Sequence, residues 1–239
     1  ASASAAPCSA SVRMFAACAR SFAFASRWAA VASSLPSRSR WAVSNSASPQ
    51  PWDVDAATGT PWFLTRGNDA PATEKWNTNV GNAQGVNYAA SATRDYVYPW
   101  TNQWFDERCN PAVFTSPEKN DIDAANANLH AMHNRMHDWS YNLGFTETAF
   151  NAQAFNFGKG GLQGDPEHGN AQAGGVVGGP PGFASRDNAN QFTPAEGLVP
   201  VTNMFLWQPI PTTFYSPCVD GDYDMSVIAH EYGHLISNR

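Results

Sequence analysis

The chain has 239 residues and a formal net charge of −6 at pH 7, and 43% of its residues are hydrophobic. That length allows one large domain or two small ones with a substantial core. The acidic balance disfavours nucleic acid and anionic membranes as partners, because both are usually bound through a basic face. No apolar run reaches the roughly 18 residues that a membrane-spanning helix needs.

The N-terminal stretch differs in composition from the rest of the chain. Between Ala1 and Pro51 there is no Asp or Glu, and the only charged residues are Arg13, Arg20, Arg27, Arg38 and Arg40. Acid-poor stretches rich in Arg, Ser and Ala are typical of organelle transit peptides. The alternative is a non-native stretch from a mispredicted exon or read-through translation. Neither interpretation predicts a folded domain, so we divide the chain into a disordered or non-native tail, residues 1–48, and a folded part, residues 49–239.

Residues 52–113 are rich in Asn, Gly, Thr and aromatic side chains. Strand-like pieces at residues 62–65 and 96–98 are separated by long stretches with turn residues. We expect short strands joined by long loops, which together form a twisted, β-rich subdomain.

The clearest predicted helix follows this segment. Asp121 or Asp123 can cap its start, and Gly144 can end it, because glycine tolerates the left-handed conformation found at helix C-termini. Between these ends, apolar residues recur at spacings of three and four. This periodicity predicts one stripe packed against a core, made by Ala125, Leu129, Met132, Met136, Trp139 and Leu143.

The same helix carries His130, His133 and His137, which share one face at positions i, i+3 and i+7. Three imidazoles on one face could hold a metal ion. More often such a stripe borders a core and faces polar neighbours. We keep a second metal site as the less favoured alternative.

The stretch between the two main helices reads as loops and strands. Residues 156–161 (NFGKGG) predict a turn, because the first glycine and the Ser or Thr of a phosphate-binding loop are absent. Residues 174–182, rich in glycine and proline, predict a surface loop, and residues 199–207 predict a strand.

The four cysteines, Cys8, Cys18, Cys109 and Cys218, form no CxxC pair. A cysteine zinc site or a thioredoxin-like redox motif is therefore not expected. Cys109 and Cys218 could form a disulfide in an oxidising compartment, but the sequence leaves open whether they meet.

The last predicted helix carries the motif HEYGH at residues 230–234. Positions four apart project from nearly the same helical face, so His230 and His234 can approach one Zn²⁺ at about 2.0–2.1 Å. Glu231 is rotated about 100° from His230, so it can take a proton from a zinc-activated water without ligating the metal. The alternative is a helix that carries these residues by chance. An Asp-rich start and an apolar lead-in favour the zinc hydrolase.

Gly233 lies inside this motif. A glycine there costs about 1 kcal/mol of helix stability relative to alanine. We therefore expect another segment to approach the helix closely at this position.

The motif and several blocks before it resemble the fungalysin family of secreted zinc metallopeptidases. The active-site helix of that family typically reads His-Glu-Tyr-x-His-x-x-Ser-Asn-Arg, and residues 230–239 follow this pattern. The similarity covers roughly residues 47–239 in the order of the family, through blocks at residues 65–68, 137–147, 156–161, 188–194 and 204–207. The chain departs from the family at Glu196, where an Asp is expected, and at Ala173, which replaces the Asp of Gln-Asp-Gly. We interpret these as loop divergence.

The resemblance implies an α+β, thermolysin-like fold, with a mixed-β subdomain, the active-site helix at the cleft floor and a C-terminal helical subdomain. It implies a zinc-dependent metalloendopeptidase that is secreted to the extracellular space and made as a zymogen with an inhibitory propeptide. Its partners would be protein or peptide substrates, and we expect a monomer. Asn188 and Ala189 resemble the edge strand against which such enzymes pair the substrate backbone.

In that family the third zinc ligand is a glutamate some tens of residues after the motif. Arg239 ends the sequence before such a helix, so we expect a truncated chain without the C-terminal helical subdomain. Zinc bound by His230 and His234 alone would be lost easily. The alternative to an active enzyme is therefore a truncated, catalytically inactive homologue or a peptide-binding remnant.

Overall fold

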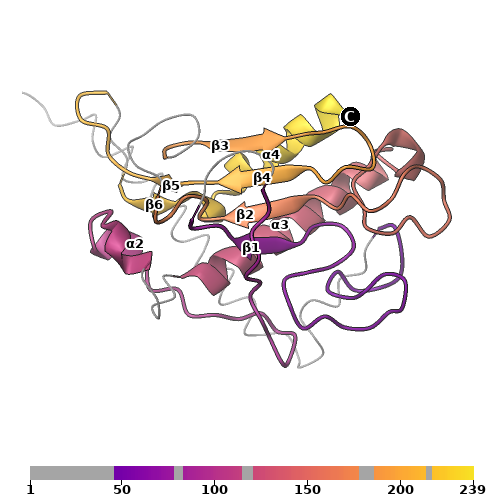
Figure 1. The fold of residues 1–239 in the computed structure, drawn as a ribbon, viewed down its shortest axis with the longest axis horizontal. Coiled ribbons are helices and arrows are strands. Elements are labelled where there is room, and N and C mark those ends of the chain that lie inside the picture. Colours follow the sequence, from indigo (N-terminus) through magenta and orange to yellow (C-terminus); the bar gives the residue numbers. More distant parts are fainter. Residues whose placement is uncertain (1–45, 78–82, 115–120, 178–185, 214–216) are drawn as a thin grey trace, which may run out of the picture. The chain divides into compact units, whose positions relative to one another are not determined.

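The computed structural model describes residues 46–77, 83–114, 121–177, 186–213 and 217–239 (Figure 1). Most of the tail predicted for residues 1–48 lies outside the described residues, as does the second half of the loop predicted for residues 174–182. The division of the chain at residues 48 and 49 stays a prediction. No helix among the described residues is long and apolar enough to cross a membrane.

The described residues form a mixed α+β fold around a four-stranded sheet. Its strands, in spatial order, are β1 (Ala72–Glu74), β2 (His168–Ala171), β4 (Val201–Met204) and β3 (Ala189–Phe192). The first three are parallel, and β3 pairs antiparallel with β4 and forms one edge. A second, two-stranded sheet pairs β5 (Leu206–Trp207) with β6 (Val219–Asp220).

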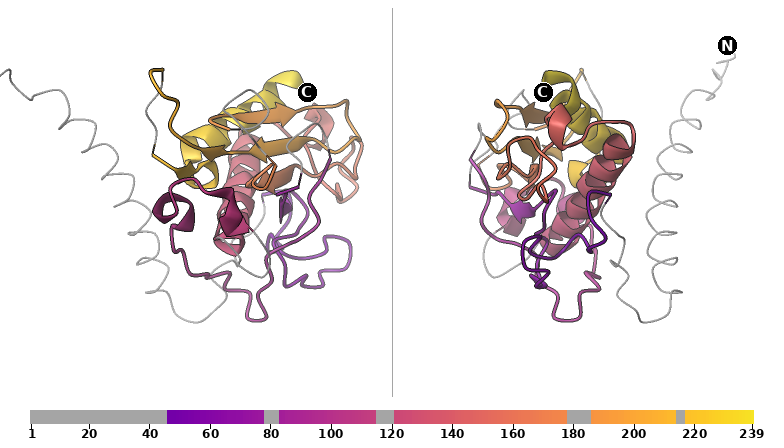
Figure 2. Two further views of the ribbon diagram at one scale, coloured as in Figure 1. Left: turned by 60° about the vertical axis from the view of Figure 1, so that its left-hand side comes forward. Right: turned by 90° about the vertical axis from the view of Figure 1, so that its right-hand side faces the viewer.

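Two long helices, α3 (Ile122–Asn142) and α4 (Met225–Asn238), cover one face of the four-stranded sheet (Figures 1 and 2). Helix α3 packs over β1 and β2, whereas α4 packs over β3 and β4. The core between these layers contains Ala72, Ala171, Ala189 and Met204 from the strands and Ile122, Ala125, Leu129 and Ile228 from the helices. Alanine on the strands lets both helices approach the sheet closely.

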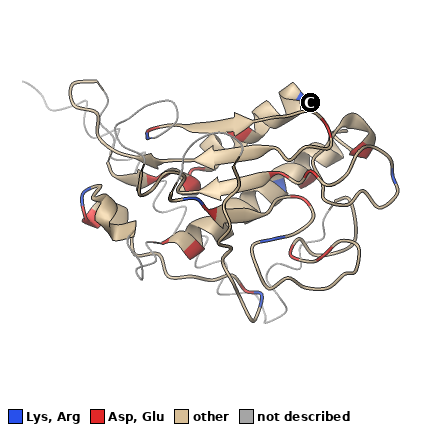
Figure 3. Cartoon of the chain, in the orientation of Figure 1, with Lys and Arg blue, Asp and Glu red and all other residues tan. Residues whose placement is uncertain are grey.

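The remaining helices are short. They are α2 (Gln103–Asp106) and three 3₁₀ turns at Pro111–Phe114, Glu147–Ala149 and Gly221–Tyr223. Figure 3 shows Lys and Arg at separate positions along the described residues, with Asp and Glu spread over several elements. Neither sign of charge therefore gathers on one helix or strand.

Helix α3 confirms the predicted helix between Asp121 and Gly144. Gly144 has φ +110°, in the region that favours glycine. Asp121 precedes the helix but does not cap it with its side chain. Its carboxylate instead accepts hydrogen bonds from the backbone N–H groups of Thr101 (2.7 Å) and Asn102 (2.6 Å). The start of α3 is thus tied to a segment that precedes it by twenty residues.

The apolar stripe predicted on α3 is wrong at its last two positions. Ala125 and Leu129 are fully buried, but Trp139 is 56% exposed and Leu143 is 70% exposed. The buried face continues instead through polar side chains, which are Asn126, His130, His133, Asn134, His137 and Ser140. Some of these side chains have polar partners outside the helix. His130 Nδ1 lies 2.7 Å from the Ala70 carbonyl oxygen, and His137 Nε2 lies 3.0 Å from Gln153 Oε1.

The β-rich subdomain predicted for residues 52–113 is also wrong. Among its described residues, β1 is the one strand, and residues 62–65 and 96–98 form none beyond a single bridge between Leu64 and Ala90. Polar side chains hold the segment together instead. The buried Asp53 carboxylate pairs with the Arg94 guanidinium and accepts a hydrogen bond from the Tyr96 hydroxyl at 2.9 Å. Isolated backbone hydrogen bonds, such as those from the Thr65 N–H to the Ala89 carbonyl and from the Ser91 N–H to the Phe63 carbonyl, both 2.9 Å, supplement these side-chain contacts in place of continuous strands.

The predicted strand at residues 199–207 is confirmed, but Phe205 divides it into β4 and β5, which belong to different sheets. Residues 156–161 form the predicted turn, with Phe157 at φ +53° and Gly158 at φ +72°. Cys109 and Cys218 meet as a disulfide, with a Cα–Cα distance of 5.3 Å across 109 residues of sequence. That bond joins the segment after α2 to the start of β6.

Candidate active site

Helix α4 is positioned from both ends. At its start the Asp224 carboxylate accepts a hydrogen bond from the Ser226 backbone N–H at 2.9 Å, which satisfies one free donor of the first turn. At its end the Arg239 guanidinium pairs with Asp165 at 2.8 Å and with Glu196 at 3.0 Å. These contacts hold the motif helix against two loops that lie far away in the sequence.

The faces of α4 differ sharply in burial. Ile228, Tyr232 and Leu235 are fully buried, whereas His230 and His234 are exposed on the other side of the helix. The apolar face anchors the helix to the sheet and to α3. Both imidazoles are left open to solvent and to a ligand.

The two exposed imidazoles converge on each other. His230 Nε2 and His234 Nε2 are 3.1 Å apart, and the rings are perpendicular. Two nitrogens that share one ion at about 2.0–2.1 Å can be separated by up to about 4 Å, so this pair fits a single Zn²⁺. Among the residues that the structure describes, no third His, Cys, Asp or Glu brings a ligand atom within 4.8 Å of both nitrogens.

A cavity of about 310 Å³ opens beside this pair. Its lining joins the start of β3, the end of β5 and the first turns of α4, through Asn188, Ala189, Trp207, Ser226, Val227, His230 and Glu231. The structure therefore brings the two residues predicted to bind substrate into the same cavity as one predicted metal ligand and the predicted base. His234 lies outside the cavity lining, next to His230.

Glu231 is 5% exposed although it follows an exposed histidine. Burial raises its pKa above the ordinary glutamate value, and the nearby His230 and His234 oppose part of that rise. A raised pKa makes a carboxylate a better proton acceptor near neutral pH.

A second buried carboxylate, Glu167, lies close enough to Glu231 for the two to repel each other. Burial raises the pKa of Glu167 to about 7. The Thr202 hydroxyl is placed between Glu167 Oε1 and Gln191 Oε1. A hydroxyl donates only one hydrogen bond, so both contacts are satisfied when Glu167 carries a proton and donates it to Thr202.

Several residues of this region were not predicted from the sequence to lie at the site. Trp207 and Ser226 line the cavity, and Glu167 lies next to the predicted base. They come from β5, the start of α4 and the residue before β2. No spacing rule connects such distant positions, so only the packing of the sheet against α4 could identify them.

The three histidines of α3 do not assemble into a metal site. All three are buried, and neither ring nitrogen of His133 has a hydrogen-bond partner among the described residues. His130 Nδ1 lies 2.7 Å from the Ala70 carbonyl oxygen, and His137 lies beside two carboxylates. The less favoured alternative of a three-histidine site is therefore wrong.

The close approach predicted at Gly233 is also wrong. A Cβ atom at this position would meet no heavy atom within 4 Å. Among the described residues, no segment packs against Gly233, so a glycine is not needed there to make room for one.

Comparison with known proteins decides the family. A model of the family described as Fungalysin metallopeptidase (M36) matches residues 31–239. The chain belongs to the fungalysin metallopeptidase family. Members of this family are metallopeptidases, so membership implies a catalytic metal.

Similar fungal proteins carry matching names. The chain is 35% identical over 195 residues to the extracellular metalloproteinase MEP of Pyricularia oryzae, covering 81% of this chain and 26% of that protein. It is 34% identical over 198 residues to extracellular metalloproteinase 2 of Arthroderma gypseum, with 82% and 27% covered. The chain thus spans about a quarter of the length of the curated relatives that it matches.

Proposed function

We propose that this chain is the part of a zinc-dependent metalloendopeptidase that carries the active-site helix. His230 and His234 would hold the zinc, and Glu231 would act as the general base in the hydrolysis of peptide bonds in proteins. One observation carries this proposal, namely that His230 Nε2 and His234 Nε2 lie 3.1 Å apart beside a cavity lined by Glu231.

Zinc, when bound, supplies a Lewis acid that polarises a carbonyl group and makes water more acidic. The chain's own residues would perform the proton transfers. The Glu231 carboxylate takes a proton from the attacking water and later returns it to the nitrogen of the leaving amine. The buried position of Glu231 at the cavity wall holds that carboxylate in one place between the two transfers.

Asn188 and Ala189 would align the substrate. Strand β3 is the edge of the four-stranded sheet, and β4 occupies only one of its sides. The backbone of an extended peptide could therefore add to the other side as a further strand. Because both residues line the same cavity as His230, a peptide paired in this way would pass beside the metal ligands.

Further parts of the proposal rest on family membership and on the names of the relatives. For the fold, we propose a thermolysin-like domain over residues 49–239 preceded by a tail at residues 1–48, with a C-terminal helical subdomain that supplies a third zinc ligand, a glutamate. We further propose that the protein is secreted to the extracellular space, is made as a zymogen with an inhibitory propeptide, and is a monomer.

The second candidate is a catalytically inactive, peptide-binding remnant. The observation that favours it is the ligand count, since the described residues bring only two imidazoles together. Structural and catalytic zinc sites normally use three or four protein ligands. Two imidazoles alone would release zinc readily.

The experiment compares wild type with Glu231→Gln for zinc content and casein hydrolysis, on the 239-residue chain and on a longer chain that includes the helix with the third ligand. Glu107→Gln, at an exposed position after α2, is the matched control. Hydrolysis by the longer wild type and a loss of at least about 100-fold in Glu231→Gln, with zinc retained, would support the proposal.

Unchanged hydrolysis in Glu231→Gln would refute the role of this base. Peptide binding by wild type and Glu231→Gln alike, with hydrolysis by neither chain length, would establish the remnant instead.

A further inference from the structure

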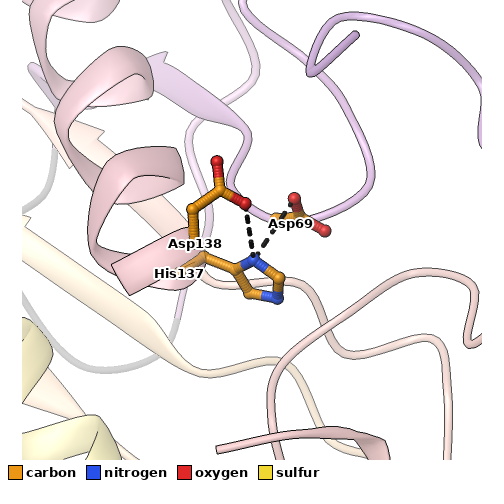
Figure 4. A group of neighbouring side chains, drawn as sticks. All are labelled: Asp69, His137 and Asp138. Atoms are coloured by element: carbon orange, nitrogen blue, oxygen red, sulfur yellow. Dashed lines mark ion pairs between the residues drawn. The ribbon is translucent and has the colours of Figure 1, made fainter. Parts of the chain in front are cut away.

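A second group of metal-ligand atoms lies at the C-terminal half of α3. His137 and Asp138 come from the helix, and Asp69 comes from the loop before β1 (Figure 4). His137 Nδ1 is 3.4 Å from Asp69 Oδ2 and 3.7 Å from Asp138 Oδ1. One ligand atom from each residue lies within 4.8 Å of the other two. The side chains of His137 and Asp69 are 1% and 0% exposed.

The other nitrogen of His137 identifies its tautomer. His137 Nε2 lies 3.0 Å from Gln153 Oε1. The Gln153 amide is oriented by its own nitrogen, which donates to the Phe155 carbonyl at 3.2 Å and to Asn156 Oδ1 at 3.3 Å. An amide oxygen only accepts, so Nε2 carries the hydrogen and donates it. In the neutral ring, Nδ1 then has a lone pair.

That lone pair points at two carboxylates, as Figure 4 shows. His137 Nδ1 is buried and makes no hydrogen bond within the described residues. A lone pair facing two anionic groups in a buried site is repulsive unless a positive charge lies between them. Either a proton or a metal ion can supply this charge.

Charge neutrality favours the metal ion. With an imidazolium, the three groups together keep a formal charge of −1. Because the side chains of Asp69 and His137 are almost fully buried and that of Asp138 is only 16% exposed, little water compensates this charge, and burying an uncompensated charge is costly. A divalent cation with a neutral imidazole and two carboxylates leaves these three groups and the ion neutral.

The donors around the site support the same assignment. The Asp138 carboxylate accepts from the Ser46 backbone N–H at 2.6 Å and from Trp52 Nε1 at 3.0 Å, and Asp69 accepts from Asn68 Nδ2 at 2.9 Å. Ligating carboxylates and histidines are usually oriented by such outer hydrogen bonds. The nitrogen–oxygen separations suit atoms that share one ion at about 2.0–2.2 Å.

We propose that Asp69, His137 and Asp138 bind a divalent first-row transition cation of the Zn²⁺ type, at a site separate from the histidine pair of α4. The imidazole ligand favours such an ion over Ca²⁺ or Mg²⁺, which prefer oxygen ligands alone. The site would be structural, because it is buried and joins the end of α3 to the loop before β1. The proposal does not depend on the function assigned to α4.

The experiment uses a variant in which the two histidines of α4 are replaced, so that they cannot contribute to the measured zinc content. The 239-residue chain carrying His230→Ala and His234→Ala is folded in the presence of Zn²⁺, passed through gel filtration, and analysed for metal content by mass spectrometry. We expect about one equivalent of zinc, and a thermal midpoint that falls by several degrees when a chelator removes it. Adding Asp69→Asn should abolish the retained zinc, whereas adding Asp106→Asn, at an exposed position on α2, should leave it unchanged.

If the His230→Ala, His234→Ala chain is folded by circular dichroism but retains no zinc after folding with Zn²⁺ and gel filtration, the proposal is overturned in favour of a protonated His137. If Asp69→Asn does not fold, ¹⁵N NMR of the histidine nitrogens in the His230→Ala, His234→Ala chain decides. A His137 Nδ1 signal that changes on chelation at constant pH supports the metal. A protonated Nδ1 that is indifferent to chelator and zinc overturns it.

Discussion

Helices α3 and α4 lie side by side on the same face of the sheet, and both carry histidines at helical spacing. The three histidines of α3 are buried. His130 and His137 have different polar neighbours, and His133 packs against the Tyr232 ring. The two histidines of α4 are exposed, and their Nε2 atoms lie 3.1 Å apart. Histidines at similar helical spacings therefore lie in opposite environments.

This difference shows that the burial of a helix face decides whether its histidines can form a candidate metal site. The side of α4 opposite the histidines is apolar and packs on the core, so the imidazoles face outward and converge on each other. On α3 the polar face is the buried one. His130 lies beside a loop carbonyl, His137 beside two carboxylates, and His133 beside the Tyr232 ring of α4. Three experiments test this contrast.

The largest effect is expected where α3 meets the sheet. Leu129 is fully buried in the core, whereas Leu143 at the end of the same predicted stripe is 70% exposed. Leu129→Ala should lower the free energy of unfolding by about 3 kcal/mol, because it removes buried methyl groups and leaves a cavity. Leu143→Ala should change it by less than about 0.5 kcal/mol. Urea unfolding measures the free energy in both variants. Equal losses would mean that Leu143 is buried like Leu129, as the predicted stripe requires.

A smaller effect on the free energy of unfolding is expected from the buried histidines, and unlike the effect of an apolar core residue it should depend on pH. Burial lowers the pKa of His133 to about 3, and His130 and His168 reinforce the shift. Unfolded histidine titrates near 6.5, so the unfolded chain binds more protons and the protein loses stability as the pH falls from 6.5 toward 3. His133→Leu should remove this contribution.

Because His130 and His168 also have lowered pKa values and the pKa of His137 is raised, the quantity to compare is variant minus wild type. Between pH 6.5 and 4.5, wild type should lose about 2 kcal/mol more than His133→Leu. Met132→Leu, at a neighbouring position without a titrating group, should run parallel to wild type. Parallel curves for His133→Leu would contradict the neutral, buried state of this ring.

The smallest effect is expected inside the α4 motif. Gly233→Ala should raise the free energy of unfolding by about 1 kcal/mol, because alanine favours the helix and the added Cβ meets open space. Gly169→Ala is the contrasting control, since its Cβ would lie 2.8 Å from Leu129 Cδ2 under α3. Thermal or urea unfolding measures both. A loss of stability in Gly233→Ala would mean that another segment approaches α4 after all.

Local patterns in the sequence were reliable wherever one helix decides the outcome. The ends of α3, the capped start of α4 and the convergence of His230 with His234 follow from helical periodicity and from the residues at the ends. The ordered blocks shared with the fungalysin family were likewise readable without coordinates, and the family match covers residues 31–239.

Contacts between distant segments decided the rest. Periodicity places Trp139 and Leu143 on the stripe that contains Leu129, but both are exposed, because the buried face of this part of α3 runs through His137 and Ser140 instead. The same holds for the Cys109–Cys218 disulfide, for the approach of Asp69 to His137, and for the cavity shared by β3 and α4. Helical geometry is determined by neighbours along the chain, whereas burial and side-chain charge depend on which remote segments the fold brings together.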